Sequence, residues 1–308
     1  MQFNFIWEST NNKLYARDEY LKKKAADSNG LNIQLTNNYA FRKTFKNTYI
    51  AKGFLMALLG LKEDEIADLK VTDPFEEGES EQEKEGILDV KIYLNNKKRI
   101  NIEMQNRYQN DWTERSIFYN CRMFTDGFYH GQPYGELEPC IHVGILDFNL
   151  IKGPEFHYHI KLLDIKTKEE YSDKLQFHVV QLKKLKNASE EEKTTELYYW
   201  AKLLAAKDWK EVDDTIKGNP YREAVKVEMY KMSQDEKERY LYLREEMAYS
   251  DEISRMRTAR EEGKEEAQQL FLKCIRLKKQ GLSKEKIAEE CQVDIKEIEK
   301  ILEELEGL

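Results

Sequence analysis

Cysteine and histidine, the usual zinc ligands, are scarce in this chain of 308 residues, which has four cysteines and five histidines. The cysteines are widely separated and form no CxxC pair, and no HExxH spacing occurs. These absences disfavour a zinc enzyme and predict reduced thiols.

The chain also lacks any run of about 18 apolar residues, the length that crosses a bilayer. Its start has no basic segment followed by an apolar one. We therefore expect a cytoplasmic protein with no membrane partner.

Charge is abundant but unevenly distributed along the chain. The formal charge of −8 argues at first against a nucleic-acid enzyme. Residues 187–308 carry 23 Lys and Arg against 30 Asp and Glu, a net −7, whereas residues 1–186 carry 27 against 28, a net −1. Part of the acidity of residues 1–186 falls in the run 76–85, which is most simply a solvated loop. The net charge therefore does not exclude phosphate binding by residues 1–186.

The hydrophobic pattern divides the chain into three predicted parts. Residues 1–35 form a polar N-terminal extension without assigned structure. Residues 36–186 alternate between helical and strand patterns in the order helix, three strands, helix, strand, and the first helix is expected from Asn37 to Gly60. Residues 187–308 are long, charged helical segments, which predict an attached all-helical C-terminal region.

The most informative passage is residues 86–105, where two amphipathic strands follow one another. Their apolar residues alternate with polar ones, so that Asp89 lies on the polar face of the first strand and Glu103 and Gln105 on that of the second. Two such strands separated by a short turn predict a hairpin.

The turn sets the register of this hairpin. Asn95 favours a turn because asparagine tolerates the left-handed conformation. A three-residue turn pairs Leu94 with Lys98 and keeps the two apolar faces together. In that register Asp89 lies opposite Glu103, so the sequence predicts two neighbouring carboxylates.

Paired carboxylates suit phosphodiester hydrolysis, in which a divalent cation can neutralise the phosphate, activate water and stabilise the leaving oxygen. Mg²⁺ prefers oxygen ligands and keeps several waters, so Asp89, Glu103 and the backbone carbonyl of Met104 suffice as protein ligands, with Mn²⁺ or Ca²⁺ as alternatives. Gln105 could orient the attacking water or a phosphate oxygen. An Asp and a Glu on an exposed hairpin face are also common without any activity, so spacing alone leaves both interpretations open.

A helix is expected over residues 111–129, with Asp111 as its N-cap. Arg115, Tyr119 and Arg122 recur along it at near four-residue intervals and could face the active site or the DNA backbone. Packing of Tyr119 into the core is the alternative. The apolar residues of this helix are Ile117, Phe118, Cys121 and Phe124.

Five ordered segments carry a resemblance to a known family. They are residues 37–45 (NNYAFRKTF), 87–90 (ILDV), 101–105 (NIEMQ), Arg115 with 118–119 (FY), and 131–134 (GQPY). Over residues 35–186 they resemble the Rpn family of recombination-promoting nucleases, also described as PD-(D/E)xK family transposases. The resemblance implies an α/β fold with a restriction-endonuclease-like core, that is, a mixed sheet flanked by helices. It also implies bacterial origin and a magnesium-dependent DNA endonuclease of a mobile element.

Two residues refine the resemblance. The family usually has Glu-x-Gln where the wider nuclease class has Glu-x-Lys, and Gln105 agrees with the narrower group, exchanging a cationic phosphate partner for a neutral one. Asn38 departs from the family, which often carries Asp there. If that acid binds metal or orients a base, its loss weakens activity; if it only caps the helix, the favoured interpretation, Asn serves equally well.

The C-terminal segment 279–298 has the rhythm of a helix-turn-helix. Its acidic second helix favours helical packing or self-association over groove binding, so a homo-oligomer formed through the C-terminal helices is a candidate assembly. The main functional alternative to a DNA endonuclease is a catalytically weak or inactive nuclease-fold protein that binds DNA or a protein partner through its helical tail, residues 187–308. A helical assembly module is a third hypothesis.

Overall fold

The computed structural model describes residues 20, 31–72, 90–95 and 97–306. The chain divides into two compact units, residues 1–245 and 246–308, and the boundary falls within helix α8 (Glu236–Lys279). No helix in the described part of the chain is long and apolar enough to cross a bilayer.

The first unit begins with two helices, α2 (Asn38–Phe45) and α3 (Thr48–Leu59), where the sequence predicted one helix. The prediction was wrong at Asn47, whose side chain accepts a hydrogen bond from the backbone N–H of Tyr49 and caps a second helix. Gly60 ends α3 in the left-handed conformation, with φ of 66°, as predicted.

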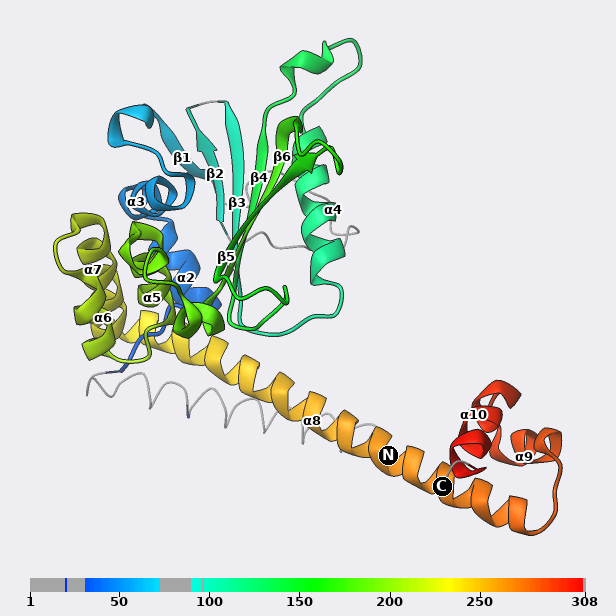
Figure 1. The fold of residues 1–308 in the computed structure, drawn as a ribbon. Coiled ribbons are helices and arrows are strands. Elements are labelled where there is room, and N and C mark those ends of the chain that lie inside the picture. The colour runs from blue at the N-terminus through cyan, green and yellow to red at the C-terminus, as the bar shows by residue number, and fades with distance from the viewer. Residues whose placement is uncertain (1–19, 21–30, 73–89, 96, 307–308) are drawn as a thin grey trace, which may run out of the picture. The chain divides into compact units, whose positions relative to one another are not determined.

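Six strands form one mixed sheet in the order β1-β2-β3-β4-β6-β5 (Figure 1). Strand β3 pairs in parallel with β4, and β4 with β6, whereas the other neighbouring pairs are antiparallel. The predicted α/β fold with a helix-flanked mixed sheet is confirmed. The strands are Leu69–Thr72 (β1), Val90–Leu94 (β2), Lys98–Gln105 (β3), Cys140–Leu146 (β4), His157–Leu163 (β5) and Glu170–Gln181 (β6).

The β2–β3 hairpin has the predicted register. Leu94 pairs with Lys98, and Val90 with Ile102. Asn95 takes the left-handed conformation expected of a turn asparagine, with φ of 54°. Asp89 and the acidic run 76–85 lie outside the described residues, so the position of Asp89 opposite Glu103 stays a prediction.

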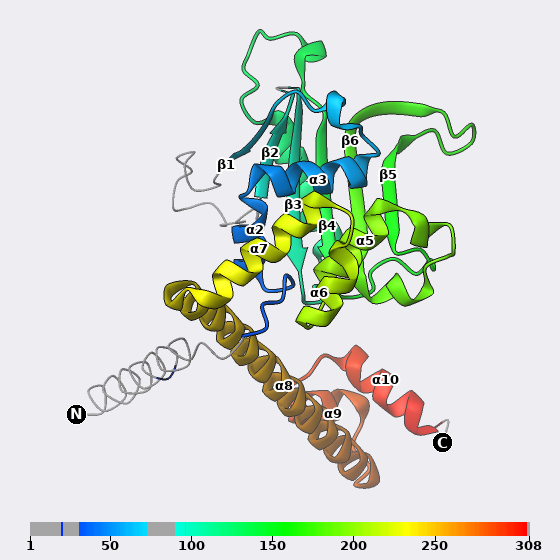
Figure 2. The same cartoon turned by 90° about the vertical axis from the view of Figure 1, so that its left-hand side faces the viewer.

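Helices cover both faces of the sheet (Figures 1 and 2). Helices α2, α3 and α5 lie on one face, with α6 and α7 packed beside them, and α4 lies on the other. The bounds are Trp112–Thr125 (α4), Glu196–Ala205 (α5), Trp209–Ile216 (α6) and Pro220–Gln234 (α7), with short 3₁₀ turns at Glu63–Glu65, Tyr134–Glu136, Leu182–Asn187 and Glu192–Thr194.

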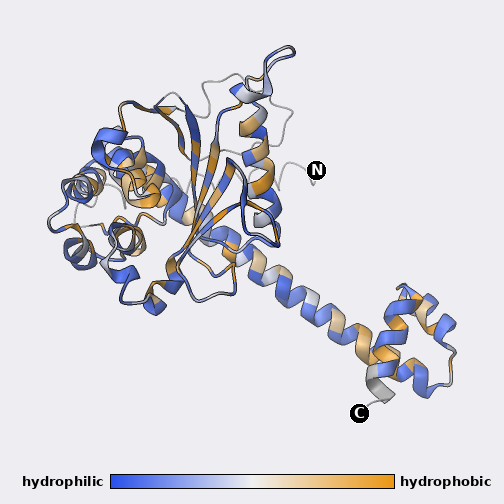
Figure 3. Ribbon diagram, turned by 45° about the horizontal axis from the view of Figure 1, so that its top comes forward, coloured by the Kyte–Doolittle hydropathy of each residue, from blue (hydrophilic) through white to orange (hydrophobic). Residues whose placement is uncertain are grey.

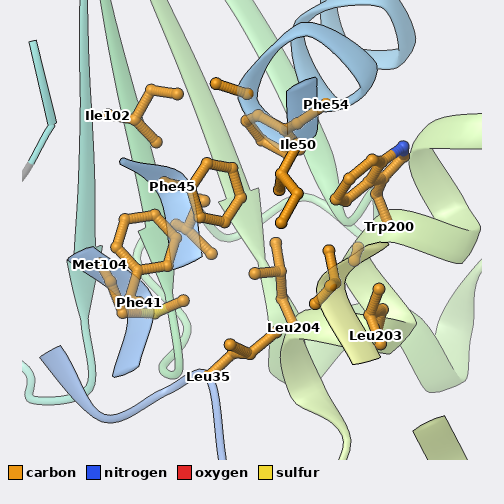
Figure 4. Close-up of a cluster of buried hydrophobic side chains, with 14 of the residues drawn as sticks. Leu35, Phe41, Phe45, Ile50, Phe54, Ile102, Met104, Trp200, Leu203 and Leu204 are labelled. Atoms are coloured by element: carbon orange, nitrogen blue, oxygen red, sulfur yellow. The ribbon is translucent and has the colours of Figure 1, made fainter. Parts of the chain in front are cut away.

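The main hydrophobic cluster fills the space between the sheet and α2, α3 and α5 (Figure 4). Phe54 packs edge-on against Phe45 and Trp200, with ring centroids 5.3 and 5.7 Å away. Trp200 belongs to α5, so a helix beyond residue 187 shares the core of the sheet. The division into a nuclease-like domain of residues 36–186 and a helical region of residues 187–308 stays a prediction.

The second unit contains α9 (Lys284–Cys291) and α10 (Ile295–Glu306), which follow the end of α8. Cys274 and Leu277 of α8 pack with Ile287 of α9 and Ile298 of α10 in a small separate core. Figure 3 shows that much of α8 is hydrophilic, and its residues 253–269 are exposed. All four cysteines of the chain are free, as predicted.

Candidate active site

The two faces of β3 differ in chemistry although both are buried. Ile100, Ile102 and Met104 belong to the main hydrophobic cluster. Asn101 and Glu103 alternate with them and therefore point to the opposite face, which α4 covers. Each is only 1% exposed, so Glu103 is a carboxyl group almost fully removed from water.

Two neighbouring side chains hold the carboxylate of Glu103. Its Oε1 accepts hydrogen bonds from Nη2 of Arg115 at 2.9 Å and from Nε2 of Gln105 at 2.6 Å. Burial raises the pKa of Glu103, and the charge of Arg115 and the bond from Gln105 offset only part of this rise. Such a perturbed buried acid at a strand end is a candidate functional group.

The structure brings two of the three predicted α4 residues to this acid. Arg115 bonds to Glu103, and its guanidinium lies over the ring of Tyr119, 5.4 Å from the centroid. Tyr119 is half-buried and contacts Arg115 instead of filling the core. Arg122 lies two turns further along α4, so its contribution to binding stays a prediction.

The buried side of α4 is not its apolar side. Ile117 and Phe118 are exposed, at 47% and 59%, because the sheet face beneath α4 is itself partly polar. The residues of α4 that face the sheet are instead Trp112, Ser116, Asn120 and Met123. This helix therefore covers a mixed layer, in which Trp112 packs with Leu146 and Val179 beside the polar residues, and it presents Ile117 and Phe118 outward.

Asn38 lies at the start of α2 but does not cap it. Asn37 does so, accepting the backbone N–H of Ala40 at 3.1 Å, which corrects the capping interpretation of Asn38. The Asn106 side chain donates to the carbonyl of Thr36 at 3.2 Å and so joins the start of α2 to the end of β3. Oδ1 of Asn38 is buried without a hydrogen-bond partner in the described structure.

His142, which was not predicted from the sequence, lies beside Asn101 in the paired strands β3 and β4. His142 is fully buried, and its Nε2 lies 3.7 Å from Oε2 of Glu103. Burial is the main reason that its pKa falls to about 3, so the ring is neutral at neutral pH. The only signal in the sequence was a histidine within an apolar strand.

Several polar atoms between α4 and the sheet lack partners. Among the described residues, Oδ1 of Asn101, Nε of Arg115, Oδ1 of Asn120 and Nε2 of His142 are buried without a hydrogen bond. Unsatisfied buried groups are costly and uncommon, so their concentration between α4 and the sheet indicates a site for water, ion or substrate.

The donor chemistry around Glu103 suits an oxygen-liganded cation. Both hydrogen bonds described for this carboxylate go to Oε1, and Mg²⁺ needs few protein oxygens because it retains waters. No cluster of three or more His, Cys, Asp or Glu suited to a metal occurs within the described ranges, which do not include Asp89. The side chain of Met104 lies in the hydrophobic cluster, and a ligand role for its carbonyl stays a prediction.

Most of the chain matches the model of one known family. A family model described as PD-(D/E)XK nuclease family transposase matches residues 35–259, which include all six strands and the Glu103 site. No match was found among curated proteins or among solved structures. Since the family model covers well over half of the sequence, the chain belongs to the PD-(D/E)XK nuclease family transposases.

Proposed function

We propose that this protein is a divalent-metal-dependent DNA endonuclease that hydrolyses phosphodiester bonds in recombination or a transposon-like process. The observation that carries the proposal is the buried Glu103, bonded to Gln105 and Arg115 on a sheet whose family is one of nucleases. Burying an acid costs folding free energy even when it is hydrogen-bonded. A role in function explains this cost, because a residue with only a structural role could be apolar.

The proposed metal ligands are Asp89, Glu103 and the backbone carbonyl of Met104. When bound, Mg²⁺, or Mn²⁺ or Ca²⁺ in its place, would neutralise phosphate charge and lower the pKa of a bound water. Gln105 and Arg115 orient the Glu103 carboxylate through Oε1. Because one bond already joins Gln105 to Glu103, its remaining hydrogen-bonding capacity is what could orient water or a phosphate oxygen.

DNA contact is proposed for residues of α4 and of α2, which lie on opposite faces of the sheet. Arg115 and Arg122 supply positive charge on α4, Tyr119 supports Arg115, and Asn38 stands at the start of α2. Such contacts to phosphates would fix the position of the duplex without reading its sequence. A homo-oligomer through the C-terminal helices is a further part of this proposal.

A second candidate is a nuclease-fold protein that binds DNA or a protein partner through its helical tail but cleaves weakly or not at all. Two observations favour it. Asn38 stands where the family often has an acid, and its Oδ1 has no partner among described residues. Glu103 is also already ion-paired with Arg115 at 2.9 Å, which competes with a cation for the same carboxylate.

Plasmid nicking in Mg²⁺ tests the first candidate. We expect the wild type to nick supercoiled DNA, and Asp89→Ala and Glu103→Ala to abolish nicking. Glu170→Ala, which removes an exposed acid of β6, is the matched control and should retain activity. Full cleavage by Asp89→Ala and Glu103→Ala would refute the assignment.

A labelled duplex, assayed for binding and cleavage in one tube, separates the two candidates. Binding without turnover favours the second candidate. If truncation after residue 245 then removes binding, residues 246–308 are the binding element; if it does not, binding belongs to the first compact unit.

A further inference from the structure

The ring of His142 packs against two aromatic side chains. Its centroid lies 5.9 Å from that of Trp112 and 6.3 Å from that of Phe177. Gly144, the next residue of β4 on the same face, leaves the space that Trp112 occupies, because a Cβ there would overlap the indole. The imidazole therefore has a fixed position in which its nitrogens face the polar residues of β3.

One of these nitrogens identifies the tautomer. Nδ1 of His142 lies 3.2 Å from Nδ2 of Asn101. An amide NH₂ group only donates hydrogen bonds, so Nδ1 accepts. A neutral imidazole carries a single proton, which must then be on Nε2, the atom that faces Oε2 of Glu103 at 3.7 Å.

We propose that His142 is a positioning residue for Glu103 and donates its Nε2–H to Oε2 of the carboxylate. The inference rests on the proposed function, in which Glu103 is a metal ligand. The bond requires a small rotation of the carboxylate, since 3.7 Å exceeds the usual length of about 2.7–3.2 Å.

This bond would complete the orientation of Glu103. Arg115 and Gln105 bond to Oε1, and His142 would hold the other oxygen. A carboxylate has about four lone-pair sites, so it could accept all three bonds and still bind a cation. Fixing a metal ligand by donors in this way raises metal affinity without contact between the donor and the metal.

The tautomer can be measured without metal or DNA. In wild-type protein labelled with ¹⁵N-histidine, long-range ¹H–¹⁵N spectra distinguish Nε2–H from Nδ1–H, and His142→Phe identifies the signal of His142. We expect a neutral ring protonated at Nε2. A ring protonated at Nδ1 would overturn the proposal, whether or not the protein cleaves DNA.

Three substitutions at His142 distinguish a role in positioning Glu103 from a role in packing. Gln places an amide N–H near the position of Nε2, Asn places one only near Nδ1, and Phe fills the ring volume with no donor. We expect His142→Asn and His142→Phe to weaken Mn²⁺ affinity by about 10–100-fold and His142→Gln to stay close to wild type. Calorimetry measures affinity, urea unfolding measures stability, and His130→Gln, at an exposed histidine, is the control.

The outcomes distinguish this proposal from the proposed function. Equal Mn²⁺ affinity in all three variants, or a Gln variant as weak as the Asn variant, overturns positioning by His142. A loss of stability with unchanged affinity does the same, since it assigns the ring to packing. No Mn²⁺ binding by the wild type contradicts the proposed function, and the tautomer then still decides whether His142 donates to Glu103.

Discussion

The two faces of strands β3 and β4 are buried to the same degree but filled with different chemistry. Toward α2, α3 and α5, the strands present Ile102 and Val143, which are completely buried in the main hydrophobic cluster. Toward α4 they present Glu103 and His142, equally hidden from water. One face of these strands is thus wholly apolar, whereas the other combines the apolar contact of Leu146 with Trp112 and the buried polar groups of Glu103 and His142, which packing alone does not explain.

The free energies of these two faces have opposite signs. Apolar burial contributes roughly 25 cal/mol for each Å² removed from water. Buried polar groups cost free energy unless they are fully bonded, and Asn101 and His142 both have an unpartnered atom among the described residues. The raised pKa of Glu103 shows that burial outweighs the attraction of Arg115. The buried polar groups of this face therefore cost stability, as those of functional sites commonly do.

The largest expected effect comes from the apolar face. Phe54→Ala removes a fully buried ring between Phe45 and Trp200 and should destabilise the first unit by about 3–5 kcal/mol. Urea unfolding followed by circular dichroism measures this change. Phe118→Ala, at an exposed ring of α4, is the control and should change stability by less than about 0.5 kcal/mol. Equal effects of the two variants would contradict the packing of the cluster.

The two sides of the sheet can also be compared by adding a methyl group at a glycine on each side. Gly53 of α3 lies against Tyr221, and Gly144 of β4 lies against Trp112, so an added Cβ would overlap each aromatic residue. Overpacking of this kind costs about 1–3 kcal/mol. We expect Gly53→Ala to cost more stability, because the contact is at the Cβ of Tyr221 and α7 must shift.

Gly144→Ala should have the larger effect on activity. Its Cβ meets the far edge of the Trp112 indole, a ring that packs against His142, so displacement changes the surroundings of Glu103. Thermal unfolding and plasmid nicking on the same samples check both expectations. If Gly53→Ala also removed activity at a temperature where it remains folded, the two faces would not be functionally distinct.

Local patterns predicted the β2–β3 hairpin well. The period-two alternation fixed which residues share a face, and Asn95 fixed the turn, so the pairing of Leu94 with Lys98 followed from about ten adjacent residues. The same local logic failed at Asn47, because a single asparagine within an apolar helical pattern does not reveal that it caps a new helix.

The features that could not be predicted from the sequence depend on contacts between segments that are distant in the chain. His142 meets Asn101 only because β4 pairs in parallel with β3, and 41 positions separate the two residues in the chain. Likewise Ile117 and Phe118 face outward because the side of α4 that packs on the sheet is a mixed one, with Trp112, Ser116, Asn120 and Met123. Arg115 could be placed on the site face from spacing, but its bond to Glu103 could not.

Each face of the sheet has one buried histidine, so the pH dependence of stability can be compared between the two faces. Burial lowers the pKa of His142 and of His178 to about 3, below the usual 6.5. Coulombic interactions with His159, His157 and Lys161 lower the pKa of His178 further. The unfolded chain therefore binds protons that the fold excludes, and stability should fall as pH decreases from 6.5 toward 3, by about 1.4 kcal/mol per pH unit for each ring.

Replacing either histidine should remove its contribution to the pH dependence of the unfolding free energy. His178→Phe and His142→Phe are expected to give similar slopes of unfolding free energy between pH 6.5 and 5, measured by urea titration. Val143, which pairs with His178, places that histidine on the apolar face. Only the His142 variant should also alter Mn²⁺ binding, and a loss of binding in both would contradict the functional separation of the faces.

The smallest expected effect is a gain in stability or no change in the Glu103→Gln variant. Because the pKa of Glu103 is raised in the fold, its favourable contribution is fully present below the unfolded pKa near 4.5 and is lost as pH rises through the folded value. Gln stays neutral and can still accept the bond from Arg115. At pH 8 the variant should thus equal or exceed wild type by up to about 1 kcal/mol.

The advantage of Glu103→Gln should shrink as pH decreases, while nicking is absent at every pH. Glu114→Gln, an exposed acid on α4, is the control and should show neither effect. A loss of more than about 2 kcal/mol at pH 8 would mean that the ion pair with Arg115 stabilises the fold. The polar face would then be explained by structure alone, and burial of an acid beneath α4 would cease to argue for catalysis.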